Sequence, residues 1–185
     1  MDETYILNVL NGDVLAFRYL IRKYKNSAFN LSRSIVHSDL DAEEAAQDAF
    51  VQAYRNLSKF KGTATFSTWF YRIVVNESLK KIKKKKLQYI PIDEITIDDT
   101  IPDLRTEPVE HLHEEEQKEM INAILEKLKE TEALLLKLYY LEDKRIEEIS
   151  EITGLTQPNC KVILFRARKS FARMYEKKVN QESRV

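Results

Sequence analysis

Residues 145–169, RIEEISEITGLTQPNCKVILFRARK, hold the pattern from which the fold can be predicted. Three isoleucines between positions 146 and 152 recur at the spacing of one face of a helix. Gly154 then permits a tight turn, because glycine adopts backbone conformations that other residues avoid. Thr156 is a suitable N-cap for a second helix, and Pro158 suits the first turn of that helix. The spacing predicts a helix-turn-helix.

The second helix of this motif is strongly basic. Between Cys160 and Lys178 it has seven basic residues and one acidic residue, Glu176. A helix that enters a major groove needs cations to contact phosphates and polar residues near its N-terminus to contact base edges. The pattern therefore favours binding of duplex DNA. A helical hairpin with a basic, solvated face is the alternative interpretation.

The composition favours an all-α fold. The chain has 185 residues, of which 43% are hydrophobic and only three are glycine, too few for a strand-rich and turn-rich protein. Its single cysteine excludes an internal disulfide. The N-terminus lacks the features of a signal peptide, and no apolar run approaches the roughly 18 residues needed to cross a bilayer. We therefore expect a cytoplasmic protein with no membrane insertion.

Helical patterns also fill the N-terminal half of the chain. Residues 11–13, Asn-Gly-Asp, form a turn signal, and the aspartate is placed to cap a helix that we expect to reach about His37. Asp41 followed by Glu44 resembles a capping box at the start of a second helix. Apolar residues recur again at helical spacing from Ser67 onward.

The formal net charge of zero hides a segregation of charge along the chain. Residues 1–90 carry 15 basic and 9 acidic side chains, residues 91–135 carry 4 and 14, and residues 136–185 carry 11 and 7. Two modules that face a polyanion, joined by an acidic segment, would have this pattern.

The modules are predicted to meet at a linker. Residues 89–108 contain three of the four prolines and no sustained period, so we expect an acidic, flexible linker there. A short strand formed by its isoleucines is the less favoured alternative. The predicted domains are residues 1–88 and residues 109–180.

Residues 60–72, FKGTATFSTWFYR, carry a second chemical pattern. Aromatic rings offer faces on which unpaired bases stack, worth about 1–3 kcal/mol per base, and nearby cations hold the backbone. This combination suits single-stranded DNA. For Trp69 and Phe70, however, burial in a hydrophobic core is the favoured interpretation. The lysine run at residues 80–86 is, by itself, more often a solvated helix face.

The sequence shows no convincing catalytic set. The histidines, His37, His111 and His113, are scattered, and the last two would point to different faces of one helix. No glycine-rich phosphate loop is present, and Cys160 occupies an apolar helix position. We therefore expect no metal site, no cofactor and no enzymatic activity.

Together these segments resemble the extracytoplasmic-function (ECF, group IV) sigma factors of the sigma-70 family, the two-domain initiation subunits of bacterial RNA polymerase. The resemblance extends over nearly the whole chain, and its specificity comes from the order and spacing of the segments. They are NGD at 11–13 with AF at 16–17, DAEE at 41–44 with QDAF at 47–50 and AYR at 53–55, FKG at 60–62, FSTWFYRI at 66–73 with Asn76, EEI at 147–149 and FRARK at 165–169.

The resemblance implies two small helical domains, a sigma domain 2-like module and a helix-turn-helix module like sigma domain 4. The first would bind the clamp helices of the largest polymerase subunit and open the −10 element of promoter DNA. The clamp-binding residues implied are Asp41, Glu44, Gln47, Asp48, Val51 and Arg55. The residues implied for the −10 element and melting are Phe60, Lys61, Gly62, Thr63, Ala64, Thr65, Phe66, Arg72, Asn76 and Lys80.

The second module would read the −35 element, and its other face would contact the flap of the second-largest subunit. The residues implied are Thr156, Gln157, Asn159, Lys161, Val162, Phe165, Arg166, Arg168 and Lys169. Arg145, Pro158 and Ile163 depart from the usual family pattern. Because Ile163 cannot donate a hydrogen bond to a phosphate or a guanine, the −35 sequence itself is not predicted.

The expected function is that of a non-catalytic initiation factor that recognises both promoter elements and has little affinity for DNA alone, since the acidic linker opposes both basic modules. Family members commonly have an anti-sigma factor, and the sequence leaves open whether this chain has one. Two other classes stay open. One is a helix-turn-helix regulator that binds duplex DNA as a dimer without being a polymerase subunit, and the other is a helical adaptor with incidental basic patches.

Overall fold

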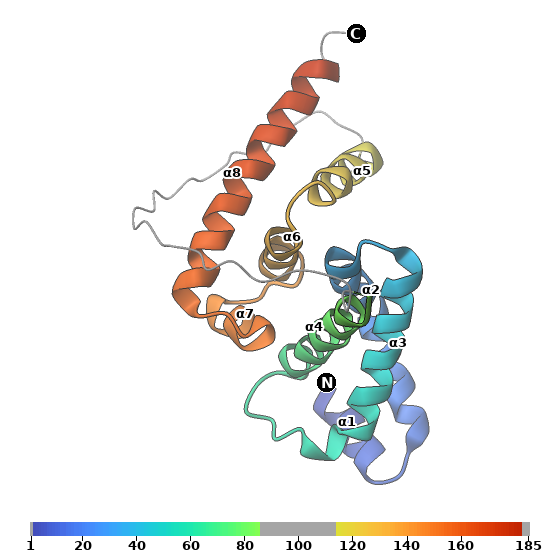
Figure 1. Ribbon diagram of the computed structural model, residues 1–185. Helices are drawn as coiled ribbons and strands as arrows, with labels where there is room; N and C mark the ends of the chain where they lie inside the picture. Colours follow the sequence, from blue (N-terminus) through green and yellow to red (C-terminus); the bar gives the residue numbers. More distant parts are fainter. Residues whose placement is uncertain (1, 86–113, 183–185) are drawn as a thin grey trace.

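The computed structural model describes residues 2–85 and 114–182, which fold into helices with no strand in either range (Figure 1). This confirms the all-α fold with two helical domains. The predicted linker at 89–108, the predicted start of the second domain at 109, His111 and His113 lie outside the described residues.

The first module is a bundle of three long helices with short additions. Its elements are α1 (Asp2–Leu10), η1 (Val14–Ala16), α2 (Phe17–Val36), α3 (Asp39–Arg55), η2 (Leu57–Lys59) and α4 (Phe66–Lys85). The helices α2, α3 and α4 each pack against the other two. The α3 face turned to the core carries five buried alanines between residues 42 and 53, and such small side chains let neighbouring helices approach closely.

Aromatic side chains fill the core of the first module. The ring of Phe70, which is fully buried, lies within 6.2 Å of the rings of Tyr24, Phe50, Phe66 and Tyr71. Tyr24 also donates a hydrogen bond to Asp2, which fixes α1 against α2. Burial of Phe70 confirms the core interpretation of that residue.

The second module contains the predicted helix-turn-helix. Its elements are α5 (Glu114–Leu125), α6 (Glu130–Leu136), the π-helical turn η3 (Lys137–Leu141), α7 (Ile146–Thr153) and α8 (Gln157–Glu182). Gly154 ends α7 in the left-handed conformation with φ +77°, and its N–H donates to the Ser150 carbonyl. Thr156 accepts a hydrogen bond from the Asn159 N–H, 3.4 Å away, so it caps α8 as predicted.

The core of this module is aliphatic. Ile149 and Ile152 of α7 belong with Cys160, Leu164, residues 133–136 and Leu138 to a buried cluster that also includes the apolar core of the first module. Cys160 is fully buried, as its position in the sequence predicts, and burial raises the pKa of its thiol. A buried thiol with a raised pKa is a packing residue rather than a nucleophile.

Three boundaries differ from the sequence predictions. Helix α1 was not expected, because a nine-residue segment gives only a short periodic signal. The cap of α3 is Ser38, whose side chain accepts from the Asp41 N–H, so the helix begins two residues before Asp41. The sequence predicts a helix from Met120 to Lys129, whereas α5 ends at Leu125 and a separate short helix follows from Glu130.

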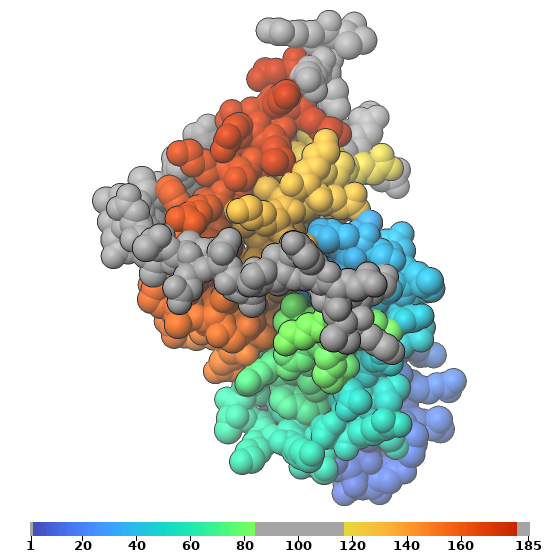
Figure 2. Space-filling model, in the orientation of Figure 1, coloured from blue at the N-terminus to red at the C-terminus, as the bar shows by residue number. Residues whose placement is uncertain are grey.

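The two modules touch each other. Helix α7 lies against α4, and α6 lies against α2. Figure 2 shows the two modules in contact along this boundary, with the orange α7 beside the green part of the chain that includes α4.

Candidate nucleic-acid interface

The loop between η2 and α4 exposes only part of the set predicted for the −10 element. Lys61, Gly62, Thr63 and Thr65 are exposed, whereas Phe66 is buried. Gly62 has φ +70°, and an added Cβ would meet nothing within 4 Å. The glycine is therefore required by the backbone conformation of the loop and not by lack of space.

The aromatic residues of this loop are engaged with each other. Phe60 is half-buried, with its ring centroid 5.3 Å from that of Trp69 and 5.9 Å from that of Phe66. Phe66 in turn stacks on Phe70, with centroids 5.8 Å apart. The half-exposed rings of Phe60 and Trp69 are therefore the aromatic surfaces of this loop that an unpaired base could reach.

Thr65 has a structural task at the start of α4. Its Oγ1 accepts a hydrogen bond from the Thr68 N–H at 3.2 Å and lies 3.0 Å from the Ser67 hydroxyl. This is the arrangement of an N-cap, which satisfies a backbone donor at the helix start. This cap fixes the residue at which α4 begins, directly after the loop.

A polar row continues from the loop along α4. Arg72, Asn76 and Lys80 are all exposed and follow each other at intervals of four residues, so they share one helix face. Lys80 forms an ion pair with Glu77 at 2.6 Å. The row presents two cations and one amide beside Lys61 and Thr63, a set that can hold phosphates and contact base edges.

The N-terminal half of α8 offers a second polar face. Thr156, Gln157, Lys161, Arg166 and Lys169 are exposed, while Asn159, Val162 and Phe165 are half-buried. Hydroxyl and amide groups at the helix start, followed by cations, form the donor set with which a helix contacts a major groove.

Arg168 is placed differently from the other basic residues of α8. Its guanidinium carbon lies 5.0 Å from the ring centroid of Tyr139 and 5.4 Å from that of Tyr140. Its Nε is buried without a hydrogen-bond partner. The side chain therefore packs on η3 of its own module, an interaction that no sequence pattern predicted.

The residues predicted to bind the polymerase clamp lie on the exposed side of α3. Glu44, Gln47, Asp48, Val51 and Arg55 are exposed, opposite the buried alanines, whereas Asp41 is half-buried.

A lysine of α4 contacts this acidic face. Lys81 Nζ lies 2.5 Å from Glu44 and 3.6 Å from Asp48, and the hydrogen bond to Glu44 raises the pKa of Lys81. The sequence gives no sign of this contact, because Lys81 lies in a run of lysines whose spacing does not set any one of them apart. Tyr54 is also exposed on α3 and packs edge-on against Phe17.

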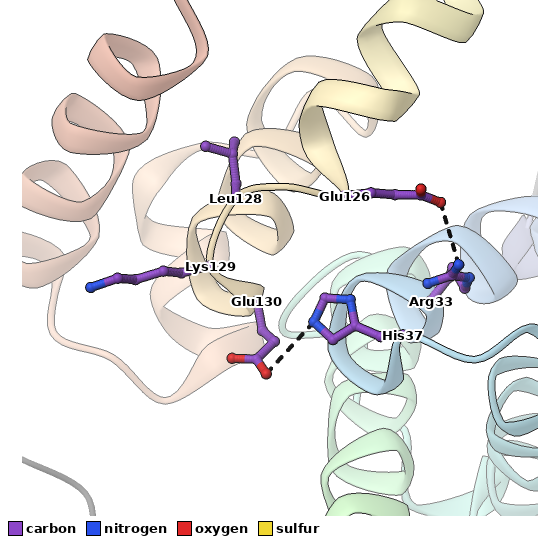
Figure 3. A pocket seen from close by; sticks show the side chains of 6 residues that line it. All are labelled: Arg33, His37, Glu126, Leu128, Lys129 and Glu130. Carbon is purple, nitrogen blue, oxygen red and sulfur yellow. Dashed lines mark hydrogen bonds and ion pairs between the residues drawn. The ribbon is translucent and has the colours of Figure 1, made fainter. Parts of the chain in front are cut away.

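A pocket of about 530 Å³ lies where the two modules meet. Figure 3 shows Arg33 and His37 of the first module opposite Glu126 and Glu130 of the second, with Leu128 and Lys129 beside them. The pocket is lined mainly by charged side chains that pair with one another. Among residues 2–85 and 114–182, no group of three or more histidine, cysteine or acidic side chains could hold a metal ion. No helix in those ranges is both long and apolar enough to cross a membrane.

Comparisons with known proteins identify the family. The model of Sigma-70 region 2 matches residues 20–88, and that of Sigma-70, region 4 matches residues 118–171. The chain is 28% identical to the ECF RNA polymerase sigma factor SigW of Bacillus subtilis over 182 residues, which cover 92% of this chain and 94% of that protein. It is 27% identical to the RNA polymerase sigma-H factor of Pseudomonas aeruginosa over 177 residues, or 91% of each chain.

Solved structures share the fold. The sigma factor RpoE from Bartonella quintana, in complex with the anti-sigma factor NepR, superimposes with a TM-score of 0.67 at 17% identity, over 88% of this chain and 98% of that one. CnrH, in complex with the cytosolic domain of CnrY, gives a TM-score of 0.65 at 17% identity, over 95% and 97% of the two chains.

The chain belongs to the extracytoplasmic-function group of the sigma-70 family. Its function is accordingly that of an RNA polymerase sigma factor, and the regulator that acts without being a polymerase subunit is not favoured.

Proposed function

We propose that the two exposed polar faces divide promoter recognition between the modules. The loop with Lys61 and Thr63, together with the row on α4, binds the −10 element as a single strand. The exposed face at the start of α8 binds the −35 element as a duplex. One observation supports this division most. On α4 and on α8, exposed polar groups that can contact bases lie on the same helix as exposed cations that can contact phosphates.

Within the −10 set, the structure supports a division of labour. Phe60 offers a half-exposed ring for stacking, and Lys61, Gly62 and Thr63 allow close approach of the loop backbone. Asn76 supplies an amide that can contact a base edge, while Arg72 and Lys80 contact phosphates. Ala64, Thr65 and Phe66 act by shaping the loop.

Core polymerase is the second proposed partner. The exposed face of α3, with Glu44, Asp48 and Val51, binds the clamp helices of the largest subunit, and the second module binds the flap of the second-largest subunit. The acidic segment between the modules lies toward the RNA exit path. An anti-sigma factor, such as the one bound to RpoE from Bartonella quintana, is a further proposed partner. We assign the chain no catalysis of its own and a cytoplasmic site of action.

Transcription in vitro tests the proposal. Purified core polymerase from the same organism is incubated with and without the protein on a fragment library of host DNA, and the 5′ ends of the transcripts are mapped. The expected result is a defined set of new start sites that share motifs near −10 and −35. No new starts, combined with no binding to that core, would contradict the proposal and favour a regulator that acts alone.

Lys161→Ala tests the role of α8 within the same assay. Lys161 is exposed near the helix start, and within the described residues its side chain forms no hydrogen bond or ion pair, so its loss should leave the fold intact. We expect roughly a tenfold loss of transcription from promoters that depend on the −35 element, equivalent to about 1–2 kcal/mol of lost DNA contact. Binding to core polymerase should not change. Loss of core binding would overturn the assignment of Lys161 to DNA.

A further inference from the structure

Arg168 of α8 lies against two tyrosine rings of its own module. Its guanidinium carbon lies 5.0 Å from the ring centroid of Tyr139 and 5.4 Å from that of Tyr140. The centroids of the two rings are 4.9 Å apart, and their planes meet at 73°. A cation close to an aromatic face is attracted by the negative potential of the ring. We call Tyr139, Tyr140 and Arg168 the arginine–tyrosine cluster.

The turn that carries the two rings is fixed to the core of its module. In η3 the Glu142 N–H donates to the Lys137 carbonyl at 3.0 Å, a bond that spans five residues and defines a π-helical turn. Leu138, which directly precedes Tyr139, is fully buried, whereas Tyr140 is 58% exposed. Because Leu138 holds η3 in place, the arginine–tyrosine cluster connects α8 to a fixed part of the module.

The guanidinium of Arg168 is not free to contact DNA in this arrangement. Its Nε is buried, and this atom has no hydrogen-bond partner among the described residues. A phosphate cannot reach this donor while the side chain lies on the rings. Arg166 and Lys169 on the same helix are exposed, so they differ from Arg168 in this respect.

The cluster lies at the C-terminal end of the segment of α8 that is proposed to read the −35 element. The N-terminal end of this segment is held by the cap at Thr156 and by Cys160, which is fully buried. Ala167 is also fully buried, and Arg168 follows it directly. The segment between residues 157 and 169 is therefore held at both ends, at its start by a cap and apolar packing and at its end by the cluster.

The orientation of α8 about its own axis decides where its exposed side chains lie. A rotation of about 10° displaces an atom that lies about 6 Å from the helix axis by about 1 Å. Such a displacement is enough to break a hydrogen bond to a base edge. Apolar packing is non-directional and resists a small rotation weakly, whereas a planar guanidinium in contact with two rings has a defined orientation.

We propose that Arg168 is a positioning residue for −35 recognition, which sets the rotation of α8 through Tyr139 and Tyr140 and does not itself contact DNA. This role rests on the proposed function of α8, whereas the cluster exists independently of it. Arg168 thereby leaves the set of DNA-contacting residues that the resemblance implies. Discrimination at the −35 element then depends on η3, a turn that lies outside the helix-turn-helix.

Side-chain NMR spectroscopy of the free, full-length protein tests the cluster itself. Ring currents shift nuclei that lie over an aromatic face, and a buried N–H exchanges slowly with water. We expect the Nε–H signal of Arg168 to be separate from those of exposed arginines and to join them in Tyr140→Leu. Tyr54→Leu, which removes an exposed tyrosine of the first module, is the control and should leave the signal in place. An Arg168 signal among those of exposed arginines in the unmodified protein would overturn the proposal.

Arg168→Lys separates positioning from phosphate contact. Lysine keeps the charge and binds phosphate well, but it lacks the planar group that packs on the rings. Holoenzyme is given two promoter fragments that differ by one −35 base pair, and the preference for the intact element is measured by transcription. We expect Arg168→Lys to lower this preference roughly fivefold, since a mismatch is penalised only when the reading groups are in place. Arg173→Lys, at an exposed position further along α8, is the matched control. An unchanged preference in Arg168→Lys would overturn the proposal.

Tyr140→Leu tests whether Arg168 acts through the rings. Tyr140 belongs to η3, outside the proposed reading face, and leucine keeps an apolar side chain at this exposed position. We expect the same fall in preference as in Arg168→Lys, and no further fall when the two substitutions are combined. Additive losses, or no effect of Tyr140→Leu, would contradict the assignment. Circular dichroism in urea checks that each variant is folded.

The salt dependence of promoter binding by holoenzyme is a readout that a general loss of structure would not reproduce. Lys169→Ala removes an exposed cation and should lower the slope of log K against log salt concentration by about 0.9, the value for one phosphate contact. Arg168→Lys should weaken binding at every salt concentration with the slope unchanged, and a lower slope would place Arg168 on a phosphate. If the unmodified protein directs no transcription with its core, the proposed function fails, and the NMR measurement still decides whether the cluster is present.

Discussion

Buried apolar residues run through both modules, whereas the boundary between the modules adds a buried polar contact. Phe70 in the first module and Ile149 in the second are fully buried and belong to one apolar cluster that includes residues of both modules. At the boundary, Thr68, Tyr71 and Lys144 also meet the other module through hydroxyl, carboxylate and ammonium groups. Apolar burial is non-directional and strong, whereas polar groups can exchange their partners for water at small net cost. The apolar cluster therefore contributes most of the cohesion, and the polar contact determines which surfaces of the two modules meet.

The largest expected effect comes from the interior of the first module. Phe70→Ala removes a ring that contacts four other aromatic rings, and such a truncation costs about 3–5 kcal/mol. We expect a lower unfolding midpoint of the first module in urea, followed by circular dichroism. Val51→Ala, at an exposed position on α3, is the control and should change stability by less than about 0.5 kcal/mol. A similar small change for Phe70→Ala would contradict the distinction between interior and boundary.

This contrast also explains what could be predicted from sequence. The helix-turn-helix follows from local signals, namely the isoleucine spacing, the left-handed turn at Gly154 and the cap at Thr156, which are encoded within a few residues. The pairing of Lys144 with Ser67 has no local signal, because neither residue belongs to a periodic pattern and their approach depends on how two modules dock.

The candidate site was predicted unevenly for the same reason. The residues of the −10 set, of α8 and of the α3 face were implied by the resemblance to sigma factors, and most of them are exposed in the structure. Periodicity alone did not show that Arg168 packs on Tyr139 and Tyr140, since its position borders both the exposed and the buried side of α8. Nor did it show that Phe66 is buried while Phe60 keeps part of its ring accessible.

An effect of intermediate size on the contact between the modules is expected from acid. Burial alone would raise the pKa of Glu148, but hydrogen bonds from Thr68 and the Arg145 N–H, together with the charge of Lys144, lower it from its ordinary value of 4.5. Only the Thr68 hydrogen bond comes from the other module, because Arg145 and Lys144 belong to the same module as Glu148. The share of the lowered pKa that is due to Thr68 stabilises the closed form above the ordinary pKa of the carboxyl, and this contribution is lost as the pH falls through the depressed value.

Energy transfer between two dyes, one attached to an exposed residue of each module, should therefore be constant from pH 7 to about 5. It should fall as the pH drops below about 4. Far-ultraviolet circular dichroism over the same range serves as the control for the module interiors, and it should change only at lower pH than the transfer does. Loss of both signals at one pH would mean that the modules unfold before they separate. Constant transfer down to the acid unfolding of the modules would show that Glu148 does not contribute to the contact between them.

The smallest effect is expected from Arg33, at the exposed edge of the same boundary. Arg33 lies 3.3 Å from Glu126 across the boundary and also pairs with Asp39 of its own module. Exposed ion pairs of this kind contribute about 0.2–1 kcal/mol and are screened by salt. Arg33→Ala should thus lower the energy transfer slightly at low salt. It should have no effect in 0.5 M NaCl, where the Debye length is about 4 Å and the attraction between the two charges is screened.

Lys23→Ala is the matched control, because Lys23 pairs with Asp2 entirely within the first module and should leave the transfer unchanged at any salt concentration. If Arg33→Ala instead opens the molecule as fully as the loss of the Thr68 and Tyr71 hydroxyls, the exposed edge holds the modules together. Closure would then depend on ionic strength. A small, salt-sensitive effect places the free energy of closure in the buried residues of the boundary, such as Thr68, Tyr71 and Lys144, and not in the exposed ion pairs.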